Sequence, residues 1–450
     1  MHKRAVIIGG GISGLSAAFF LSERIARENL SLKITVLEAE NRFGGLLRTL
    51  RTRDFHMEAG ADAFDGRDPA MLALCRDLGL RDELVPCEPT LDRVFLAQNE
   101  KLLSLSLSRP DLRAVFKNPA LNLTARMRLL FEGLIPAKRN GADESIASFV
   151  RRRLGRTVLQ AWAEPLVRGV LMGEAEKLSI HEYFPQWQRM ERDHGSICRA
   201  LLNRNMPAKE APSFFTVRGG LDRLASAFLE KLERANLVSS SRAVSLGRNK
   251  TWKVFLRDGR TIEADFVWVA LPAPEAARLL TAAAPPLAGA LAKIRYDSLA
   301  AVNMVFRRGA LPADFPQNGF ILPPRGKKRP FANLKVIGST EDGKFIRLRA
   351  FLSKVFQPEL LGLEDARIRQ EVLRDLVAEW RVQPPFWIAV ERYPEALAQY
   401  ETGHGRLVSN IESLLEPYPG LFLAGNGYHG FGISDCILSA KAAVQGIKLF

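Results

Sequence analysis

A glycine-rich turn near the start of the chain has the residue types and spacing that bind a diphosphate. The turn, residues 9–14, follows an apolar run at residues 4–8, which predicts a buried strand. A helix is predicted directly after the turn, over residues 15 to about 26. A strand, a glycine turn and a helix in this order form the first half of a dinucleotide-binding βαβ unit, so the sequence predicts a dinucleotide cofactor.

Each glycine of the turn has its own physical role. Gly9 allows a tight turn out of the strand, Gly11 lets the backbone approach a pyrophosphate without a Cβ in the way, and Gly14 lets the helix pack closely on the strand. The helix N-terminus, at Ile12 and Ser13, would present free N–H groups and the positive end of its dipole to the phosphates. The alternative, glycines that serve only packing, is disfavoured because the turn lies between a strand and a helix.

An acidic residue completes this predicted site. A second apolar run ends at Glu38, where a carboxylate can accept hydrogen bonds from a ribose diol. Residues 38–45 have the pattern Glu-x-x-x-Arg-x-Gly-Gly, which resembles FAD-dependent oxidases and desaturases of the amine oxidase type. In those proteins the second glycine pair passes close to the flavin diphosphate. The resemblance implies FAD and assigns cofactor contacts to Ala39, Arg42, Gly44, Gly45 and Leu46.

A second glycine-rich turn lies near the C-terminus. Residues 421–425 predict a strand, and residues 434 to about 448 predict a helix. The four glycines around this junction exceed what a helix cap needs, and they would let backbone approach a flat group. The helix N-terminus would stabilise the negative charge that develops on the pyrimidine edge of a reduced flavin. The predicted cofactor contacts in this turn are Gly425, Gly430, Phe431, Gly432 and Ile433.

Composition agrees with a reduced globular protein of two or three domains. The chain has 450 residues, of which 47% are hydrophobic. No apolar run approaches the roughly 18 residues that span a membrane, and the basic start of the chain leads into the glycine turn rather than a cleavage site. We therefore expect no transmembrane helix, no signal peptide and a cytoplasmic location. The four cysteines lack CxxC spacing, so neither a metal site nor a disulfide is predicted.

A net charge of +15 limits the classes of partner. Residues 101–210 hold 19 Lys or Arg against 11 Asp or Glu, an excess of eight positive charges. Such an excess suits nucleic acid, an anionic membrane surface or an acidic substrate. No nucleic-acid-binding module is recognisable, so we expect no nucleic acid partner. The arginines at 151–153 are interpreted either as solvated helix charge, for at least two of the three, or as a membrane contact.

The predicted elements indicate an α/β fold with interleaved domains. We expect an FAD-binding Rossmann-type domain made of residues 1–90, 212–275 and 405–450. Residues 91–211 have mostly helical patterns and would form a helical domain. Residues 276–404 would form a substrate-binding domain with a mixed sheet. Individual strands are predicted over residues 214–217, 252–256, 266–271, 300–306 and 345–352.

Nearly end to end, the chain resembles the FAD-dependent protoporphyrinogen and coproporphyrinogen oxidases of haem biosynthesis. The motifs that support this resemblance occur in family order at residues 58–60, 91–96, 152–155, 164–170, 177–180, 184–185, 195–197, 218–221, 399–404 and 424–430. The resemblance implies oxidation of a porphyrinogen by successive two-electron steps, with oxygen as the acceptor, and a helical domain that rests on a membrane. It also adds Gly60, Ala61 and Val244 to the expected cofactor contacts.

A porphyrinogen is a wide apolar ring with carboxylate arms, so it needs an apolar pocket and a few cationic anchors. Arg93 matches a family arginine that pairs with a propionate. The alternative is that Arg93 is an ordinary surface residue at the start of a strand. Gly319, Phe320 and Ile321 match a segment that packs on the macrocycle, although ordinary core packing explains Phe320 and Ile321 almost as well. Arg168 lies in a family motif near the site, with a buried ion pair as the alternative role.

No constellation of His, Cys or carboxylate residues suggests a general base, so we expect no catalytic side chain in the acid–base sense. The expected mechanism is hydride transfer to flavin N5, with the protein supplying orientation, desolvation and propionate pairing. The resemblance implies an anionic membrane surface, a downstream chelatase and a homodimer as partners. Rival interpretations are a flavin amine oxidase, a carotenoid-type desaturase, or a flavin-bound protein without turnover. Cys436 lies inside the last predicted helix, where it is poorly placed to tether a flavin.

Three departures from the family concern the substrate more than the flavin. Residues 323–330 are basic where relatives often carry an acidic residue, residues 349–353 replace a glycine-rich strand end, and Ala61 stands where proline is common. A basic pocket rim would favour coproporphyrinogen, with four carboxylates, over protoporphyrinogen, with two. The same charges could instead face lipid, so both substrates stay open.

Overall fold

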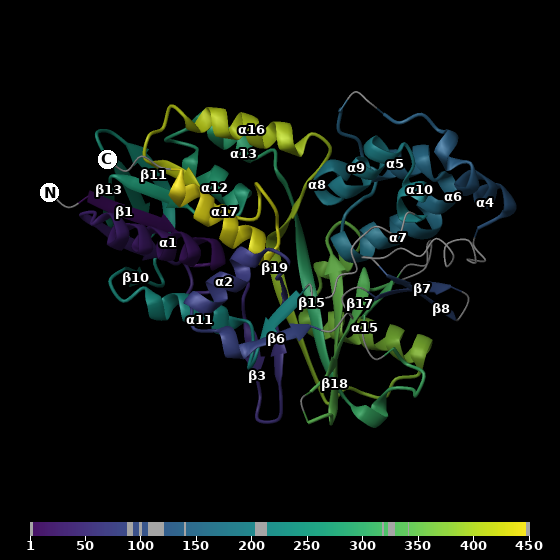
Figure 1. Ribbon diagram of the computed structural model, residues 1–450. Helices are drawn as coiled ribbons and strands as arrows, with labels where there is room; N and C mark the ends of the chain where they lie inside the picture. The colour runs from purple at the N-terminus through teal and green to yellow at the C-terminus, as the bar shows by residue number, and fades with distance from the viewer. Residues whose placement is uncertain are drawn as a thin grey trace.

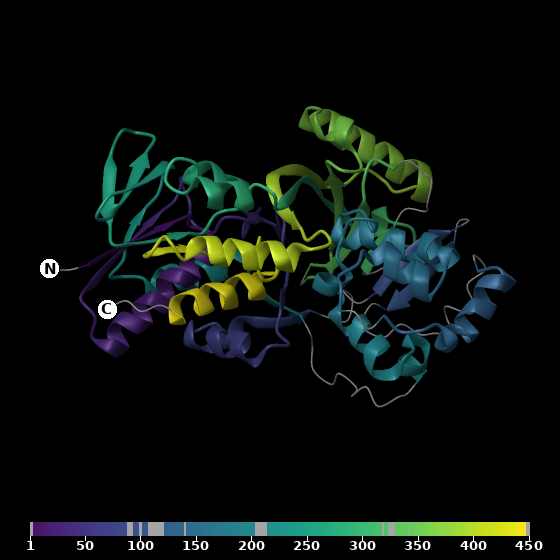
Figure 2. The ribbon, with the colours of Figure 1, turned by 90° about the horizontal axis from the view of Figure 1, so that it is seen from above.

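Two large sheets, each built from separate parts of the chain, organise the molecule (Figure 1). A group of short helices packs at one end of the second sheet, and both Figure 1 and Figure 2 place these helices at the far end from α1 (Ile12–Glu28). The computed structural model describes residues 3–87, 93–98, 101–106, 121–138, 141–202, 214–316, 319–322, 329–340 and 342–446. The predicted α/β fold class is confirmed.

The first sheet is parallel throughout, with the order β10-β2-β1-β14-β20. Its strands are β1 (Lys3–Ile8), β2 (Leu32–Leu37), β10 (Asn236–Val238), β14 (Phe266–Val269) and β20 (Leu421–Leu423). The central strands β1 and β14 are almost entirely buried, as a parallel sheet covered on both faces requires. Both ends and the middle of the chain therefore contribute to one nucleotide-binding sheet.

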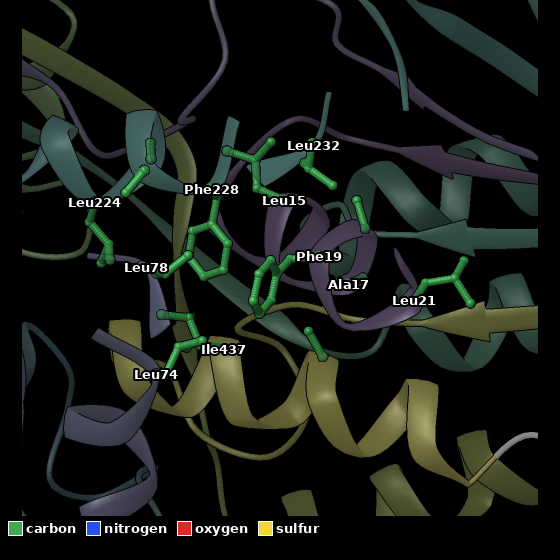
Figure 3. Close-up of a cluster of buried hydrophobic side chains, with 14 of the residues drawn as sticks. Leu15, Ala17, Phe19, Leu21, Leu74, Leu78, Leu224, Phe228, Leu232 and Ile437 are labelled. Atoms are coloured by element: carbon green, nitrogen blue, oxygen red, sulfur yellow. The ribbon is translucent and has the colours of Figure 1, made fainter. Parts of the chain in front are cut away.

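One face of this sheet is covered by α1 and α17 (Ile433–Gln445), with α2 (Pro69–Asp77) and α11 (Asp222–Lys231) beside them. Figure 3 shows the core between them, where Phe19, Phe228 and Ile437 point toward one another from α1, α11 and α17. The rings of Phe19 and Phe228 meet edge to face, with centroids 5.5 Å apart. This packing holds the N-terminal ends of α1 and α17 in one region.

The opposite face is covered by three helices and a small antiparallel meander. The helices are α12 (Ala273–Leu280), α13 (Pro285–Leu291) and α16 (His404–Leu415). The meander comprises β11 (Ala243–Arg248), β12 (Trp252–Leu256) and β13 (Thr261–Ala264). The short strands predicted in this part of the chain are confirmed.

The second sheet is mixed, with the order β19-β15-β18-β17-β16-β7-β8. Its strands are β7 (Arg93–Gln98), β8 (Lys101–Ser106), β15 (Arg295–Arg307), β16 (Gly319–Leu322), β17 (Asn333–Ser339), β18 (Phe345–Ser353) and β19 (Trp387–Gln399). Helix α15 (Asp365–Trp380) covers one face with Ile368, Val372 and Leu376, and α14 (Pro358–Leu361) follows β18. The opposite face, called the inner face below, contacts the segment after β4 (His56–Glu58).

The hairpin formed by β7 and β8 differs from the helical prediction for residues 91–211. β7 pairs in parallel with β16, and β8 pairs with β7, so the hairpin extends the mixed sheet. The helical interpretation is wrong here because two short apolar runs flank the polar pair Asn99-Glu100 in the sequence, a pattern typical of a hairpin. The hairpin thus packs with residues of the predicted segment 276–404.

The remaining part of this region is helical, as predicted, and most of its helices are short. They are α4 (Leu123–Leu130), α5 (Ile146–Arg153), α6 (Arg156–Val158), α7 (Glu164–Leu166), α8 (Ile180–Tyr183), α9 (Pro185–His194) and α10 (Ile197–Leu202), with the 3-10 turn η3 (Glu132–Leu134). The π-helical segments η4 (Leu159–Ala163) and η5 (Val167–Leu171) join α6 and α7 into one continuous helix over residues 156–171. Ser145 and Ser179 cap α5 and α8 by accepting backbone N–H bonds.

The arginines at 151–153 are not uniformly solvated. Arg153 is completely buried and donates to the carbonyl oxygens of Ile135 at 2.6 Å and Gly195 at 2.8 Å. Arg152 is half-buried, and only Arg151 is exposed. The expectation of at least two solvated arginines is wrong because three carboxylates neutralise the inner two: Glu132 of η3, Glu144 before α5 and Glu191 of α9.

Two small sheets connect the main ones. They consist of β3 (Thr49–Arg51) with β4, and of β5 (Phe64–Asp65), β9 (Phe214–Val217) and β6 (Leu84–Cys87). All four cysteines are unpaired, and Cys75, Cys198 and Cys436 are buried. Within the described ranges, no helix is both long enough and apolar enough to cross a bilayer.

Candidate functional site

The first glycine turn has the geometry expected of a diphosphate-binding turn. The chain leaves β1 through Gly9, which has a φ of +109° that favours glycine. A Cβ on Gly14 would lie 1.8 Å from the carbonyl oxygen of Gly9, so only glycine fits where α1 crosses β1. Both glycines are therefore required by the backbone itself.

Gly11 differs from these two because a Cβ would fit at this position without a clash. A Cβ there would meet nothing nearer than the Cα of Gly45, at 3.8 Å. Ile12 and Ser13 begin α1 next to this space, where the first N–H groups of a helix have no partner within the helix. Gly44 donates to the carbonyl oxygen of Gly10 at 2.8 Å, which fixes the second glycine pair opposite the first turn. The two glycine segments thus lie side by side at contact distance, next to the start of α1.

Glu38 lies immediately after β2, next to this turn. One carboxylate oxygen accepts the N–H of Gly10 and the other accepts the N–H of Glu40, each at 2.8 Å, while Ala39 lies between. The carboxylate is buried, and its orientation is fixed by these two bonds. A carboxylate has about four acceptor positions, so it can still accept from a ribose diol.

Arg42 shapes the second glycine pair. Its guanidinium donates to the carbonyl oxygens of Gly45 at 2.6 Å and Leu47 at 3.3 Å. Gly44 and Gly45 both have positive φ, at +104° and +56°. The arginine therefore stabilises a tight loop that leaves the side chain of Leu46, between its two acceptors, exposed.

Val244, the position expected to contact adenine, occupies an irregular point of the meander. Ala243 pairs with Leu256 and Ser245 pairs with Phe255, so Val244 is the extra residue of a β-bulge. A bulge residue does not share fully in the ladder, which leaves backbone polar groups for a ligand. The N–H of Ser241 donates to the carbonyl oxygen of Glu38 at 2.7 Å, which brings this strand start beside the acidic residue.

Gly60 and Ala61 follow β4 and face the inner face of the mixed sheet. A Cβ on Gly60 would lie 3.0 Å from the hydroxyl of Tyr393 on β19. That hydroxyl is buried and has no hydrogen-bond partner among the described residues. Burial raises the pKa of Tyr393 to about 12, so its hydroxyl stays a donor at physiological pH. The segment that the resemblance assigned to the flavin therefore adjoins an unused donor.

The C-terminal glycine turn is anchored by Tyr400, at the end of β19. Its hydroxyl donates to the carbonyl oxygen of Asn426 at 2.7 Å and accepts the N–H of Gly430 at 3.0 Å. Its ring stacks on His404, with centroids 3.9 Å apart, and lies beside Phe431. One side chain thus joins two backbone groups of the turn.

The end of this turn leads into α17. Gly425 and Gly430 have φ values of +141° and +113°. The N–H of Gly432 donates to the carboxylate of Asp435 at 3.0 Å, and Ile433 opens the helix. Cys436, one turn later, is buried, and its burial raises the pKa of its thiol to about 12. It is a core thiol that contacts Ser13 of α1, so the starts of the two helices are neighbours.

These residues fit an FAD molecule. Three predicted contacts are large apolar side chains that are unusually exposed: Leu46 at 48%, Val244 at 46% and Phe431 at 40%. Each of them adjoins a backbone-lined surface, and a ligand with flat apolar rings would cover them. The side-chain-free backbone at Gly11, beside the start of α1, suits a diphosphate, and the neighbouring carboxylate of Glu38 suits a ribose.

Four of the residues predicted to bind substrate lie on β7 and β16, which follow β17 in the mixed sheet. Phe320 pairs with Val94 across β16 and β7, so the strand that begins at Arg93 adjoins the Gly319–Leu322 strand. The side chains of Arg93 and Phe320 lie outside the described part of the structure. Gly319 has a φ of +103°. Ile321 is buried in the cluster beneath α15, which favours core packing for this residue.

Arg168 lies in η5, which packs against the ends of β16 and β17. The side chain of Asn333 donates to the carbonyl oxygen of Gly169 at 2.5 Å, which fixes this contact. The guanidinium of Arg168 lies 4.5 Å from the centre of the Phe356 ring and forms no ion pair with any described residue. Burial lowers its pKa, although an arginine stays protonated near neutral pH. The alternative role, a buried ion pair, is therefore not found.

A cavity of about 670 Å³ opens elsewhere, between the β3–β4 hairpin and β17. Its lining includes Phe55, Glu58, Asp62, Cys87, Lys335 and Arg347. Of the described residues that sequence analysis assigned to cofactor or substrate, none lines it. The cavity therefore adjoins the segment that holds Gly60 on the side that faces β17, and it does not reach the glycine turns.

Sequence reasoning missed Tyr393 and Asn426 as parts of the site. Tyr400 occurred in a family motif, but its role as an anchor was not apparent. His404 has a structural role: it is buried, stacked on Tyr400, and contacts the carbonyl oxygen of Tyr428 at 3.3 Å. These contacts join residues far apart in sequence, so no local pattern indicates them.

Comparison with known proteins agrees with this geometry. The model of the flavin containing amine oxidoreductase family matches residues 12–448. Coproporphyrinogen III oxidase of Bacillus subtilis (strain 168) is 30% identical to this chain, over 98% of this chain and 97% of the relative. Protoporphyrinogen oxidase of Bos taurus is also 30% identical, over 99% and 98%.

A solved structure extends the comparison to the fold. A protein from Exiguobacterium sp. 255-15, provisionally named protoporphyrinogen oxidase, superimposes with a TM-score of 0.86 at 26% identity, over 99% of this chain and 98% of that one. The chain belongs to the flavin containing amine oxidoreductase family, and this membership confirms the flavin cofactor that the glycine turns predicted.

Proposed function

We propose that the protein oxidises a porphyrinogen to the corresponding porphyrin in haem biosynthesis, with FAD as its resident cofactor and molecular oxygen as the acceptor. The proposal rests on the likeness, along the whole chain, to oxidases named for coproporphyrinogen III and for protoporphyrinogen. When bound, the flavin supplies the hydride acceptor for the ring. The residues of the chain bind and orient the two partners and exclude water.

The junction of η5 with β16 and β17 is the proposed substrate site. Arg168 offers a half-buried cation next to the aromatic ring of Phe356, and no described carboxylate neutralises it. A guanidinium in this position can pair with a carboxylate arm of the ring. We assign the same role to Arg93, and Gly319 would lie beside the macrocycle. Ile321 is better explained as core.

The basic segment at 323–330 gives limited support for a particular substrate. Residues 323–328 lie outside the described residues. Arg329 is buried and pairs with Asp375 at 2.8 Å and with Glu379 at 2.6 Å, so its charge is already neutralised. Coproporphyrinogen III and protoporphyrinogen IX both remain candidate substrates, and their turnover must be compared directly.

Anaerobic titration of the purified holoprotein tests the proposal. We expect the flavin absorbance near 450 nm to bleach on addition of coproporphyrinogen III or protoporphyrinogen IX, and porphyrin fluorescence to appear when air is admitted. The ratio of kcat/KM for the two porphyrinogens identifies the substrate. Bleaching by amines, with none by porphyrinogens, would instead support the amine oxidase alternative.

We also propose that the protein docks on an anionic membrane surface through the apolar patch of α4 and η3. The patch consists of the exposed side chains Leu123, Met127, Leu130, Phe131 and Leu134. Leu134 is 79% exposed, while Ala125 and Leu129 on the opposite side of α4 are buried. Figures 1 and 2 show α4 at the extreme end of the molecule, away from the nucleotide sheet. An apolar patch on a protein of charge +15 suits anionic lipid.

A cytoplasmic location, a downstream chelatase that receives the product, and a homodimeric state are predictions of the family resemblance. Size-exclusion chromatography with light scattering measures the oligomeric state directly. Transfer of porphyrin to a chelatase would be observed as faster metal insertion when the two proteins are mixed than when free porphyrin is supplied.

A further inference from the structure

Three buried polar side chains form a row across the inner face of the mixed sheet. Asn303 on β15, Lys335 on β17 and Arg349 on β18 occupy directly paired positions of neighbouring strands. Their exposed fractions are 0%, 7% and 1%. We call them the inner-face row. A cationic pair inside a sheet is costly to bury, so the row needs specific partners.

Arg349 uses all three nitrogens of its guanidinium. Its Nε donates to Asn303 Oδ1 at 2.7 Å, while its two terminal nitrogens donate to the carbonyl oxygens of Glu58 and Gly60. One terminal nitrogen also reaches the carboxylate of Asp62 at 3.3 Å. A planar fork with donors on both sides can satisfy this set of acceptors, whereas a lysine ammonium cannot span it.

The other two members of the row bind the same segment. The side-chain amide of Asn303 donates to the carbonyl oxygen of Ala59 at 2.9 Å. Lys335 Nζ donates to the carboxylate of Asp62 at 2.7 Å. Burial disfavours the charged form of Asp62, but the two neighbouring cations outweigh it and hold the pKa of this carboxyl below its usual range. Three successive carbonyls and one carboxylate of residues 58–62 are thus bound by the row.

Because the inner-face row binds the carbonyl groups of residues 58–60, the N–H groups that follow them remain for the cofactor. The carbonyls of residues 58–60 are bonded to the sheet, and the N–H of Ala59 donates to the carbonyl oxygen of Arg48 at 2.8 Å. Among the described residues, the N–H groups of Gly60 and Ala61 have no hydrogen-bond partner. Since the carbonyl contacts fix the peptide planes, they also fix the directions of these two N–H groups.

We propose that Arg349 is a positioning residue for the flavin, which orients the Gly60–Ala61 backbone through the carbonyls of Glu58 and Gly60. The proposal rests on the flavin site described above and on no assumption about the substrate. Arg349 does not contact the flavin in this account. It acts through the backbone that does, and it couples the mixed sheet to the nucleotide-binding domain.

The test compares Arg349→Lys with Arg347→Lys. Arg347 lies on the same strand, two residues earlier, and donates to the carbonyl oxygens of His56 at 3.5 Å and Ser339 at 3.0 Å. Its charge helps to lower the pKa of Asp62, as the charge of Arg349 does, and a lysine at either position retains that charge. Both substitutions keep the charge and remove the fork. Apoprotein of each variant would be titrated with FAD, followed by flavin fluorescence, and the reduction potential of the bound flavin would be measured by dye equilibration.

For Arg349→Lys we expect FAD to dissociate at least tenfold more readily and the potential of the bound flavin to shift, while Arg347→Lys stays within twofold of the parent protein. If Arg349→Lys does not fold, Asn303→Ala, which retains the arginine but releases its Nε and the Ala59 carbonyl, replaces it with an expected change of three- to tenfold. The proposal would be overturned if the folded variant had an unchanged FAD affinity and an unchanged flavin potential and lost only thermal stability. Arg349 would then be a structural residue.

Failure of the positioning role of Arg349 can be distinguished from failure of the porphyrinogen proposal. If the parent protein binds FAD but no porphyrinogen bleaches it, the substrate assignment fails, and the comparison of FAD affinities still decides the role of Arg349. If porphyrinogens are oxidised normally and both lysine variants bind FAD alike, the substrate assignment stands and the positioning role fails.

Discussion

The hydroxyl of Tyr400 donates to the carbonyl oxygen of Asn426 at 2.7 Å while it accepts the N–H of Gly430 at 3.0 Å. These two contacts span the C-terminal glycine turn, so the turn depends on a side chain from the end of the mixed sheet. The backbone N–H of Tyr400 also contacts the hydroxyl of Tyr183 on α8, at 3.2 Å. Elements from all three parts of the molecule therefore meet at this residue.

Replacement of Tyr400 by Phe should weaken FAD binding by about 5- to 150-fold, because two hydrogen bonds of roughly 0.5–1.5 kcal/mol each are lost while the ring stacking remains. Titration of apoprotein with FAD measures the change. Tyr418→Phe is the control, since Tyr418 lies outside the turn and should bind FAD normally. Equal affinities of the two variants would contradict the anchoring role.

Substitutions in the first glycine turn should separate folding from cofactor binding. Gly14→Ala places a Cβ 1.8 Å from the oxygen of Gly9 and should destabilise the apoprotein itself. Gly11→Ala meets no atom within 3.4 Å, so the apoprotein should melt normally but bind FAD at least tenfold more weakly. Melting curves with and without FAD distinguish the two cases. A normal gain in Tm on adding FAD to Gly11→Ala would contradict the assignment.

Glu58 should make stability depend on pH. Burial raises the pKa of its carboxyl to about 7, and bonds from the Leu221 N–H and the Thr49 hydroxyl offset this only partly. The unfolded carboxyl has a pKa of about 4.3, so between these values only the folded state holds the proton. The contribution of Glu58 is therefore present at low pH and is lost as the pH rises through about 7, by at most about 4 kcal/mol.

Glu58→Gln should remove this pH dependence, because a glutamine can accept from Leu221 and donate to Thr49 without ionising. Urea unfolding at pH 5 and pH 8 measures it: the free energy of unfolding of the variant, relative to the parent, should rise by about 1–3 kcal/mol between the two pH values. In the control Glu230→Gln, at a mostly exposed position, the free energy of unfolding should change between pH 5 and pH 8 by the same amount as in the parent. The same result for Glu58→Gln would disprove the prediction.

The apolar patch of α4 and η3 predicts a specific effect on membrane binding. The double substitution Leu130→Ser with Leu134→Ser should lower the fraction bound to anionic phosphatidylglycerol vesicles about tenfold, since each leucine loses roughly 1 kcal/mol or more of burial. Leu363→Ser with Val377→Ser removes two exposed apolar side chains from the mixed-sheet side and should bind normally. Co-sedimentation compares the pairs, and equal binding would exclude the patch as the docking surface.

The ion pair of Arg153 with Glu132 predicts a large loss of stability. Both side chains are fully buried, so Arg153→Met leaves a carboxylate without its cation and should lower the free energy of unfolding by about 3–5 kcal/mol. The double variant with Glu132→Gln should recover much of this loss. Arg151→Met, at an exposed ion pair, should change stability by less than about 1 kcal/mol. Chemical denaturation of the four proteins tests the coupling.

Local physical constraints explain which features were predictable from sequence. Gly9, Gly14 and Glu38 act within about 30 residues of one another, and their spacing follows from the geometry of one βαβ unit. Arg349 and Asp62 are 287 residues apart, and nothing near either residue indicates the other. Arg153 was expected to be exposed because its neighbours in sequence are arginines. The carboxylates that neutralise it, Glu132 and Glu191, belong to other helical elements.

The assembly of the nucleotide sheet has a consequence for synthesis of the chain. β20 lies two strands away from β1 in the sheet but begins at Leu421, so it is synthesised long after β1 (Lys3–Ile8). The nascent polypeptide must therefore hold an incomplete sheet, with an unpaired edge on β14, until β20 has been synthesised. Shielding by a chaperone during this interval, rather than the intrinsic stability of the finished fold, would then set the yield of native protein.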